Sequence, residues 1–143
     1  MTCIAWDGKT IASDKRATSD GFCSTTTKLF RTKPGQIISF CGGGAQGLEM
    51  RAWIAAGAKA NTFPASQRDD DNWAVVVVLD KRGLWYYERT PYPLKVEDAF
   101  YAFGSGRDYA MAAMHLGKTA REAVEIACLF DSGCGNGVTE MSL

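Results

Sequence analysis

The sequence predicts an α+β fold, a four-layer αββα sandwich in which two sheets lie between two layers of helices. Three observations support this prediction. The elements read in the order strands, helix, strands, two helices, strand; short turns between strands indicate antiparallel hairpins; and the helices fall in two separate blocks. Because helices gather on one face of an antiparallel sheet, two blocks of helices favour two sheets, each covered on its outer face.

Length and charge limit the domain count and the partners. The chain has 143 residues, of which 46% are hydrophobic and 22% charged. That length predicts one core, and therefore a single domain over residues 1–143. Sixteen basic and sixteen acidic residues cancel, so no net field attracts nucleic acid or an anionic membrane, and we expect neither as a partner.

Hydropathy along the chain predicts a cytoplasmic protein. The longest unbroken apolar run is Ala74 to Leu79, far shorter than the roughly 20 residues that span a bilayer. The N-terminus lacks a basic region followed by an apolar stretch, so we expect no leader.

The cysteines predict neither a metal nor a cofactor. They form no CxxC pair, and His115 is the single histidine, so a zinc-like ligand set is missing. Free cysteine packs as a small hydrophobic residue, which favours reduced and mostly buried thiols. The five cysteines are Cys3, Cys23, Cys41, Cys128 and Cys134.

The first predicted strands form a hairpin. Thr2 to Trp6 and Lys9 to Ser13 flank Asp7-Gly8, a dipeptide that readily adopts the positive dihedral angles of a tight turn. A second pair of strands, Phe22 to Arg31 and Gln36 to Cys41, is separated by a Pro-Gly break.

A glycine corner and a helix follow the second pair of strands. Gly42-Gly43-Gly44 forms the corner, and apolar residues then recur at helical spacing. The apolar positions are Leu48, Ala52, Ile54, Ala55 and Ala58. The polar stretch Asn61 to Asp71 contains a proline and three consecutive aspartates, which predicts a solvated loop.

The second half of the chain begins with another hairpin. Trp73 to Leu79 and Leu84 to Glu88 flank a turn that ends in Gly83, and a further short strand is expected at Ala99 to Phe103.

Two helices and a last strand complete the chain. Asp108 to Leu116 forms the first of these helices, with Tyr109, Ala112, Ala113 and Leu116 on one side. Thr119-Ala120-Arg121-Glu122 resembles a capping box for a helix to about Phe130. The last strand is expected from Gly137 to Met141.

Three polar residues suggest catalysis by an N-terminal threonine. A threonine exposed as the first residue carries a hydroxyl nucleophile and an α-amine, whose pKa of about 7.7 to 8 suits a base at neutral pH. Such a site also needs a nearby cation, an acid that holds the cation, and backbone N–H donors for the oxyanion. Thr2, Lys28, Asp14 and the corner Gly42-Gly43 could supply these groups.

The ordered set of motifs resembles the proteasome β-subunit family of N-terminal nucleophile (Ntn) hydrolases, and most closely the simpler bacterial protease that works with an unfoldase ATPase. The motifs are Thr2, "ASDKRAT", "TTTKLF", "FCGGGAQ", "FGSGRDYA" and "FDSGCGNGV". Each glycine motif alone is weak, because glycines mark many turns. The resemblance covers roughly residues 2–52 and 99–138, and it implies the αββα fold and peptide-bond hydrolysis.

The resemblance also implies a role for each matching residue. Thr2 would be the nucleophile and, through its amine, the base. Asp14 and Lys28 would be its supporting pair, and Gly42 or Gly43 the oxyanion donor. Ser105, Asp131 and Cys134 would support the amine. Cys134 stands where the family usually has serine, and the segment before Trp73 is too short for the family's second long helix, so the chain resembles a shortened member.

Two other nucleophilic or basic side chains were weighed. Cys3 lacks a free amine and, by strand alternation, faces away from Thr2, so we expect it to be packed. His115 lies on a helix and is expected at the surface or at an interface.

Removal of Met1 is a condition for this chemistry, because an amide with Met1 occupies the nitrogen of Thr2. The small side chain at position 2 favours removal of the methionine, and we expect no propeptide.

Three functions remain open on the sequence. The first is a threonine-type peptidase that cleaves peptide bonds through an acyl-ester on Thr2. The second is an inactive proteasome-like scaffold or assembly protein, and the third is an Ntn amidase that acts on a small amide. For the first, we expect a peptide or unfolded-protein substrate, a homo-oligomer, and an unfoldase ATPase as a candidate partner.

Overall fold

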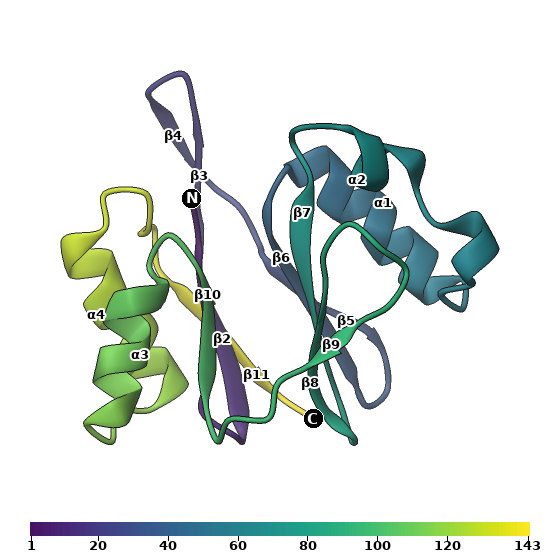
Figure 1. Cartoon of the computed structure of the whole chain (residues 1–143). Helices are drawn as coiled ribbons and strands as arrows, with labels where there is room; N and C mark the ends of the chain where they lie inside the picture. The colour runs from purple at the N-terminus through teal and green to yellow at the C-terminus, as the bar shows by residue number, and fades with distance from the viewer.

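A computed structural model describes all residues 1–143, and Figure 1 shows two sheets packed face to face with helices on both outer sides. The predicted αββα sandwich is confirmed. No helix in the structure is both long enough and apolar enough to cross a membrane.

The predicted hairpin forms the two central strands of the four-stranded sheet. Strands β1 (Cys3–Trp6) and β2 (Thr10–Asp14) pair antiparallel around Gly8, whose φ is +94°. The late strands β10 (Tyr101–Gly104) and β11 (Val138–Ser142) add to the two edges, in the order β10-β1-β2-β11. The sheet thereby joins the chain's beginning to its end.

The second sheet has five antiparallel strands in sequential order. They are β5 (Leu29–Lys33), β6 (Gln36–Gly42), β7 (Ala74–Asp80), β8 (Gly83–Tyr87) and the two-residue β9 (Leu94–Lys95).

The helices cover the two outer faces (Figure 1). Helices α3 (Arg107–His115) and α4 (Ala120–Phe130) cover the four-stranded sheet, and α1 (Gly44–Ala55) covers the five-stranded sheet. The predicted capping box is confirmed, since Thr119 and Glu122 exchange side-chain and backbone hydrogen bonds at the start of α4.

Three apolar layers separate the four structural layers. Alternation along β1 directs Cys3 and Ala5 toward α3 and α4, and Ile4 toward the core between the two sheets. A third cluster, which includes Met50 and Trp53, lies between α1 and the five-stranded sheet. Because side chains alternate along a strand, Thr2 lies on the same side as Ile4 and faces the second sheet.

The prediction of one continuous strand from Phe22 to Arg31 is wrong. β4 (Phe22–Thr25) instead pairs with β3 (Arg16–Ser19) in a separate two-stranded ribbon, which projects from the body (Figure 1). Asp20 and Gly21, with φ of +48° and +81°, form its turn. The ribbon breaks the run because the chain must cross from it to β5 through Thr26–Lys28.

The predicted loop Asn61 to Asp71 contains short helices. They are a 3-10 turn at Ala60–Thr62 and α2 (Ala65–Asp69). The fully buried side chain of Gln67 bonds α2 to the backbone of Ala74 and Glu88. Tertiary contacts of one side chain thus order a segment with polar composition.

Two predicted helix faces are wrong, and one cysteine is an exception to the thiols predicted to be mostly buried. In α1 the buried face carries Met50, Trp53 and Ile54, and Leu48 is exposed. In α3, Tyr109 and Leu116 are exposed, since the buried residues there are Ala110, Ala113 and Met114. Cys23 is exposed on the ribbon. Apolar residues occur on both sides of these helices, so spacing alone does not select the buried side.

Candidate active site

Thr2 lies at the start of β1 with only 5% of its surface exposed. Its carbonyl oxygen accepts from the N–H of Gly106 (3.2 Å), and its nitrogen donates to the Ser105 hydroxyl (3.2 Å). A Cβ on Gly104 would overlap the Thr2 carbonyl, and the φ of Gly104 is +91°. Glycine therefore permits the close approach that holds Thr2.

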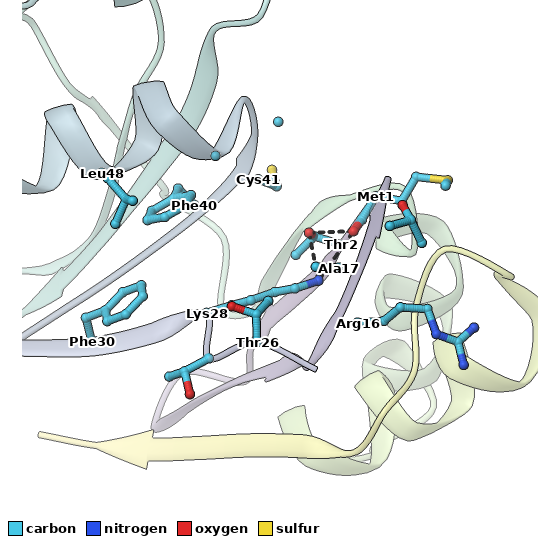
Figure 2. Close-up of a pocket in the computed structure, with 14 residues that line it drawn as sticks. Met1, Thr2, Arg16, Ala17, Thr26, Lys28, Phe30, Phe40, Cys41 and Leu48 are labelled. Atoms are coloured by element: carbon cyan, nitrogen blue, oxygen red, sulfur yellow. Dashed lines mark hydrogen bonds between the residues drawn. The ribbon is translucent and has the colours of Figure 1, made fainter. Parts of the chain in front are cut away.

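Lys28 brings a cation to the hydroxyl of Thr2. Its Nζ lies 3.0 Å from Thr2 Oγ1 and 2.9 Å from Asp14 Oδ1, and its side chain is only 8% exposed. Figure 2 shows the lysine extended toward Thr2. Ser39 Oγ donates to the Lys28 carbonyl (2.6 Å), which fixes the backbone at this point.

Asp14 is fully buried at the end of β2 and accepts from four donors. Besides Lys28, these are the backbone N–H groups of Cys3 (3.0 Å), Arg16 (3.0 Å) and Gly135 (3.1 Å). A buried carboxylate is stable only when paired and hydrogen-bonded. This set of donors keeps Asp14 in place to hold Lys28.

A chain of polar groups leads from the nitrogen of Thr2 to Asp131. Ser105 Oγ lies 3.9 Å from Cys134 Sγ, and the thiol donates to Asp131 Oδ2 over 3.3 Å. The N–H of Gly133 donates to Asp131 Oδ1 (2.8 Å), which fixes the carboxylate in the loop after α4.

The pKa values of the acid and the thiol in this chain shift in opposite directions. Desolvation raises the pKa of Asp131, but the hydrogen-bonding groups of Ser105, Gly133 and Cys134 outweigh it and hold the pKa below its usual value. Desolvation, followed by the negative charge of Asp14 and the contact with Asp131, raises the pKa of Cys134 to about 12. At neutral pH the pair is therefore a carboxylate that accepts from a neutral thiol.

The two glycines considered for the oxyanion site differ in their surroundings. The N–H of Gly43 donates to the Trp73 carbonyl (3.2 Å), so this donor is already used. Gly42, with φ of +102°, lines both cavities that border Thr2. The geometry favours Gly42 over Gly43.

Met1 lies against the same groups. Its carbonyl oxygen accepts from Thr2 Oγ1 (2.7 Å) and from Lys28 Nζ (3.3 Å), the triangle of dashed lines in Figure 2. With Met1 present, the nitrogen of Thr2 is an amide and cannot act as a base.

A cavity of about 340 Å³ opens beside Thr2. Phe30, Phe40 and Leu48 gather on one side of it, and Ala17 and Thr26 lie on another (Figure 2). Arg51 lies over the ring of Phe30 at 4.3 Å. The exposed Leu48 thus belongs to the wall of this cavity.

The structure brings Thr2, Lys28 and Asp14 into one hydrogen-bonded group, and it brings Ser105, Cys134 and Asp131 to the nitrogen of Thr2. The backbone donors to Asp14 could not be predicted, because a backbone N–H has no sequence signal of its own. The cavity wall formed by Arg16, Ala17 and Thr18 of β3 was not predicted either, since no strand was expected between Ser13 and Phe22.

Cys3 and His115 lie away from this group. Cys3 is fully buried under the helices of the four-stranded sheet, and His115 is exposed at the end of α3. No three His, Cys, Asp or Glu side chains gather to hold a metal ion.

Comparison with known proteins shows the fold. No protein-family model and no curated protein sequence matches the chain. Among solved structures, Thiobacillus denitrificans BPH superposes with a TM-score of 0.76 at 20% identity, covering 100% of this chain and 97% of that one. The BPH complex with epoxomicin gives 0.74 at 18% identity, covering 99% and 97%.

A eukaryotic protein has the same fold. HslV from Trypanosoma brucei superposes with a TM-score of 0.70 at 20% identity, and the match covers 98% of this chain and 97% of that one. All three similarities extend over nearly the whole of both chains.

Proposed function

We propose that this chain is a threonine-type peptidase of the proteasome β-subunit family, with Thr2 as its nucleophile once Met1 has been removed. The observation that carries the proposal is the buried contact of Lys28 Nζ with both Thr2 Oγ1 (3.0 Å) and Asp14 Oδ1 (2.9 Å). A buried cation beside a hydroxyl lowers the free energy of the alkoxide. A threonine with a purely structural role forms no alkoxide and does not need such a cation.

Before any turnover, hydrolysis of the Met1–Thr2 bond frees the α-amine. The amine then takes the proton of Thr2 Oγ1 as the oxygen attacks a peptide carbonyl. The N–H of Gly42 donates to the resulting oxyanion.

Collapse of this intermediate breaks the peptide C–N bond. The leaving nitrogen takes the proton from the Thr2 ammonium, and an acyl-ester remains on Thr2. Water, deprotonated by the same amine, then hydrolyses the ester and regenerates the hydroxyl.

The groups around the nitrogen of Thr2 orient the amine. Ser105 Oγ already contacts this nitrogen at 3.2 Å, and Cys134 and Asp131 lie behind the serine. Asp131 remains a carboxylate, and its negative charge favours the ammonium that forms when the amine accepts a proton.

Three variants test the assignment of Thr2. Thr2→Ala abolishes peptidase activity, and Thr2→Ser retains part of it. One uncleavable residue inserted before Thr2 abolishes activity although the hydroxyl is untouched, because the amine is lost as a base. Activity that survives the insertion contradicts the proposal, since a serine- or cysteine-type site with a separate base is indifferent to such an extension.

Two measurements distinguish the peptidase from the scaffold and from the amidase: the intact mass of the purified chain and the length of the substrate that it prefers. A purified chain that retains Met1 and hydrolyses no peptide favours the scaffold. A chain that turns over a single amino-acid amide faster than an extended peptide favours the amidase.

A further inference from the structure

A second cavity lies at the opposite end of β6 and α1 from Gly42. It measures about 200 Å³, and Ile54, Val78 and Pro93 contribute its apolar lining. Gln36, the first residue of β6, and Ala58, just beyond α1, also border it. The cavity shares no lining residue with the cavity beside Thr2.

A tryptophan whose indole N–H is buried without a partner lies in the wall of this cavity. Trp85 lines it, and Trp85 Nε1 is the one buried side-chain nitrogen or oxygen in the protein that has no hydrogen-bond partner. Buried polar groups are otherwise paired, because a buried group without a partner loses its hydrogen bonds to water and gains none in return. By contrast, Trp53 Nε1 donates to the Lys59 carbonyl (3.0 Å).

The charge around Trp85 is positive. Lys33 and Arg82 line the cavity, and Lys95 Nζ and the Arg82 guanidinium each lie 5.5 Å from the centre of the Trp85 ring. Asp80 pairs with Arg82 (2.8 Å) and compensates one of these three charges. The end of α1 contributes only about half a negative charge, so the cations determine the sign.

A polar cavity adjoins the apolar one. Both are lined by Lys33, Gln36 and Arg82. The polar cavity adds Lys81 and Asp80, the partner of Arg82, and has no hydrophobic lining residue. The combination suits a ligand with an apolar group in the first cavity and an anionic group in the polar cavity beside it.

We propose that this cavity binds a small organic anion, a carboxylate or phosphate attached to a compact aromatic or branched apolar group. Lys33 and Arg82 pair with the anionic group, and the ring of Trp85, which lines the cavity, packs against the apolar group. The Arg82 side chain is 69% exposed and can turn from Asp80, which is 13% exposed and keeps the backbone N–H of Arg82 as a donor (2.8 Å). This site uses no residue of the Thr2 centre.

Titration followed by NMR tests this proposal. The chain has four tryptophans, and loss of one indole N–H signal in Trp85→Phe identifies Trp85. Phenylacetate and phenyl phosphate serve as probes, with the neutral phenylacetamide as their control. We expect a saturable shift of the Trp85 signal with at least one acid, and binding about tenfold weaker or more for the amide. The acid that binds more tightly identifies the anionic group.

Charge variants provide the second arm of the test. Lys33→Gln combined with Arg82→Gln weakens binding about tenfold or more, whereas Lys118→Gln, an exposed lysine outside the cavity lining, leaves it unchanged. Thr2→Ala binds as the unaltered protein does, which separates this site from the peptidase proposal. No saturable shift at millimolar concentration, equal binding of the amide, or indifference to the double variant overturns the proposal.

Discussion

Lys28 is held by two acceptors of different kinds, the carboxylate of Asp14 and the hydroxyl of Thr2. Lys28→Ala removes the cation next to the hydroxyl and leaves Asp14 with its three backbone donors but without a paired charge, so we expect a folded variant with a lower melting temperature. Turnover should fall by about 10²–10³. Peptide hydrolysis measures the loss, and circular dichroism checks the fold.

The exposed Lys9→Ala variant is the matched control and should keep full activity. Asp14→Asn should reduce turnover less than Lys28→Ala, because the cation stays. A folded Lys28→Ala variant with full activity would contradict the assigned role of the lysine.

The thiols provide a test of burial at single residues. Burial raises the pKa of Cys41 and Cys128 to about 11, that of Cys134 to about 12, and that of Cys3 still higher. A raised thiol pKa means that the reactive thiolate is scarce at pH 8. Cys23 is the exposed cysteine, so iodoacetamide at pH 8 should add one rapid label by intact mass.

Cys23→Ser should remove that rapid label. Rapid modification of Cys134 instead would show that the group behind Ser105 is open to solvent, contrary to the geometry described.

Asp7 connects the β1–β2 turn to helix α4. Its Oδ1 accepts from the N–H groups of Lys9 (3.0 Å) and Thr10 (2.8 Å), and its Oδ2 accepts from that of Ala120 (2.8 Å). Desolvation raises the pKa of Asp7, but these backbone hydrogen bonds outweigh it and leave the pKa below its usual value. A lowered folded-state pKa stabilises the protein above the unfolded value of about 3.9, and this stabilisation is lost as pH falls through the folded value.

Asp7→Asn should therefore lower the melting temperature at pH 7, and its difference from the unaltered protein should shrink below about pH 4. Thermal unfolding at several pH values measures this. Asp98→Asn, at an exposed site outside every ion pair, is the control and should change little. A pH-independent difference for Asp7→Asn would mean that the charge of Asp7 does not stabilise this junction.

Elements with a local signal were predictable. Asp7-Gly8 and the capping box at Thr119 each specify their structure through a few neighbouring residues, and both are confirmed. The β3–β4 ribbon and α2 were not predicted. Helix α2 depends on contacts of Gln67 with distant backbone groups, and the sequence of β4 runs into that of β5 without a turn signal, which left β3 without an expected partner.

The residues of the candidate site that lie together could be proposed from the sequence, whereas their contacts could not. The order of motifs indicated Thr2, Asp14 and Lys28, since the chemistry requires a nucleophile, an acid and a cation. The choice between Gly42 and Gly43 depends on whether a backbone N–H is already paired with Trp73, which only the three-dimensional structure reveals.

At the scale of the whole molecule, several large apolar side chains remain exposed. Tyr109 and Phe130 stack at 5.6 Å on the α3–α4 face, where Leu129 is 77% exposed. Apolar surface that gathers on a protein marks interaction sites, so we predict a homo-oligomer. Light scattering at micromolar concentration measures the mass, and a monomer would contradict this prediction. Phe130→Asp should lower the mass, whereas His115→Asp, at the far end of α3, should not.

The central claim is that Thr2 supplies a hydroxyl and a free amine to one reaction. An electrophile that closes a ring with both groups of an N-terminal threonine tests it most directly, with intact mass and peptide mapping as the readout. We predict one adduct on Thr2 in the chain that lacks Met1, and none in the chain that retains Met1 or in Thr2→Ala. A chain that lacks Met1, hydrolyses peptides and forms no adduct on Thr2 would contradict the account.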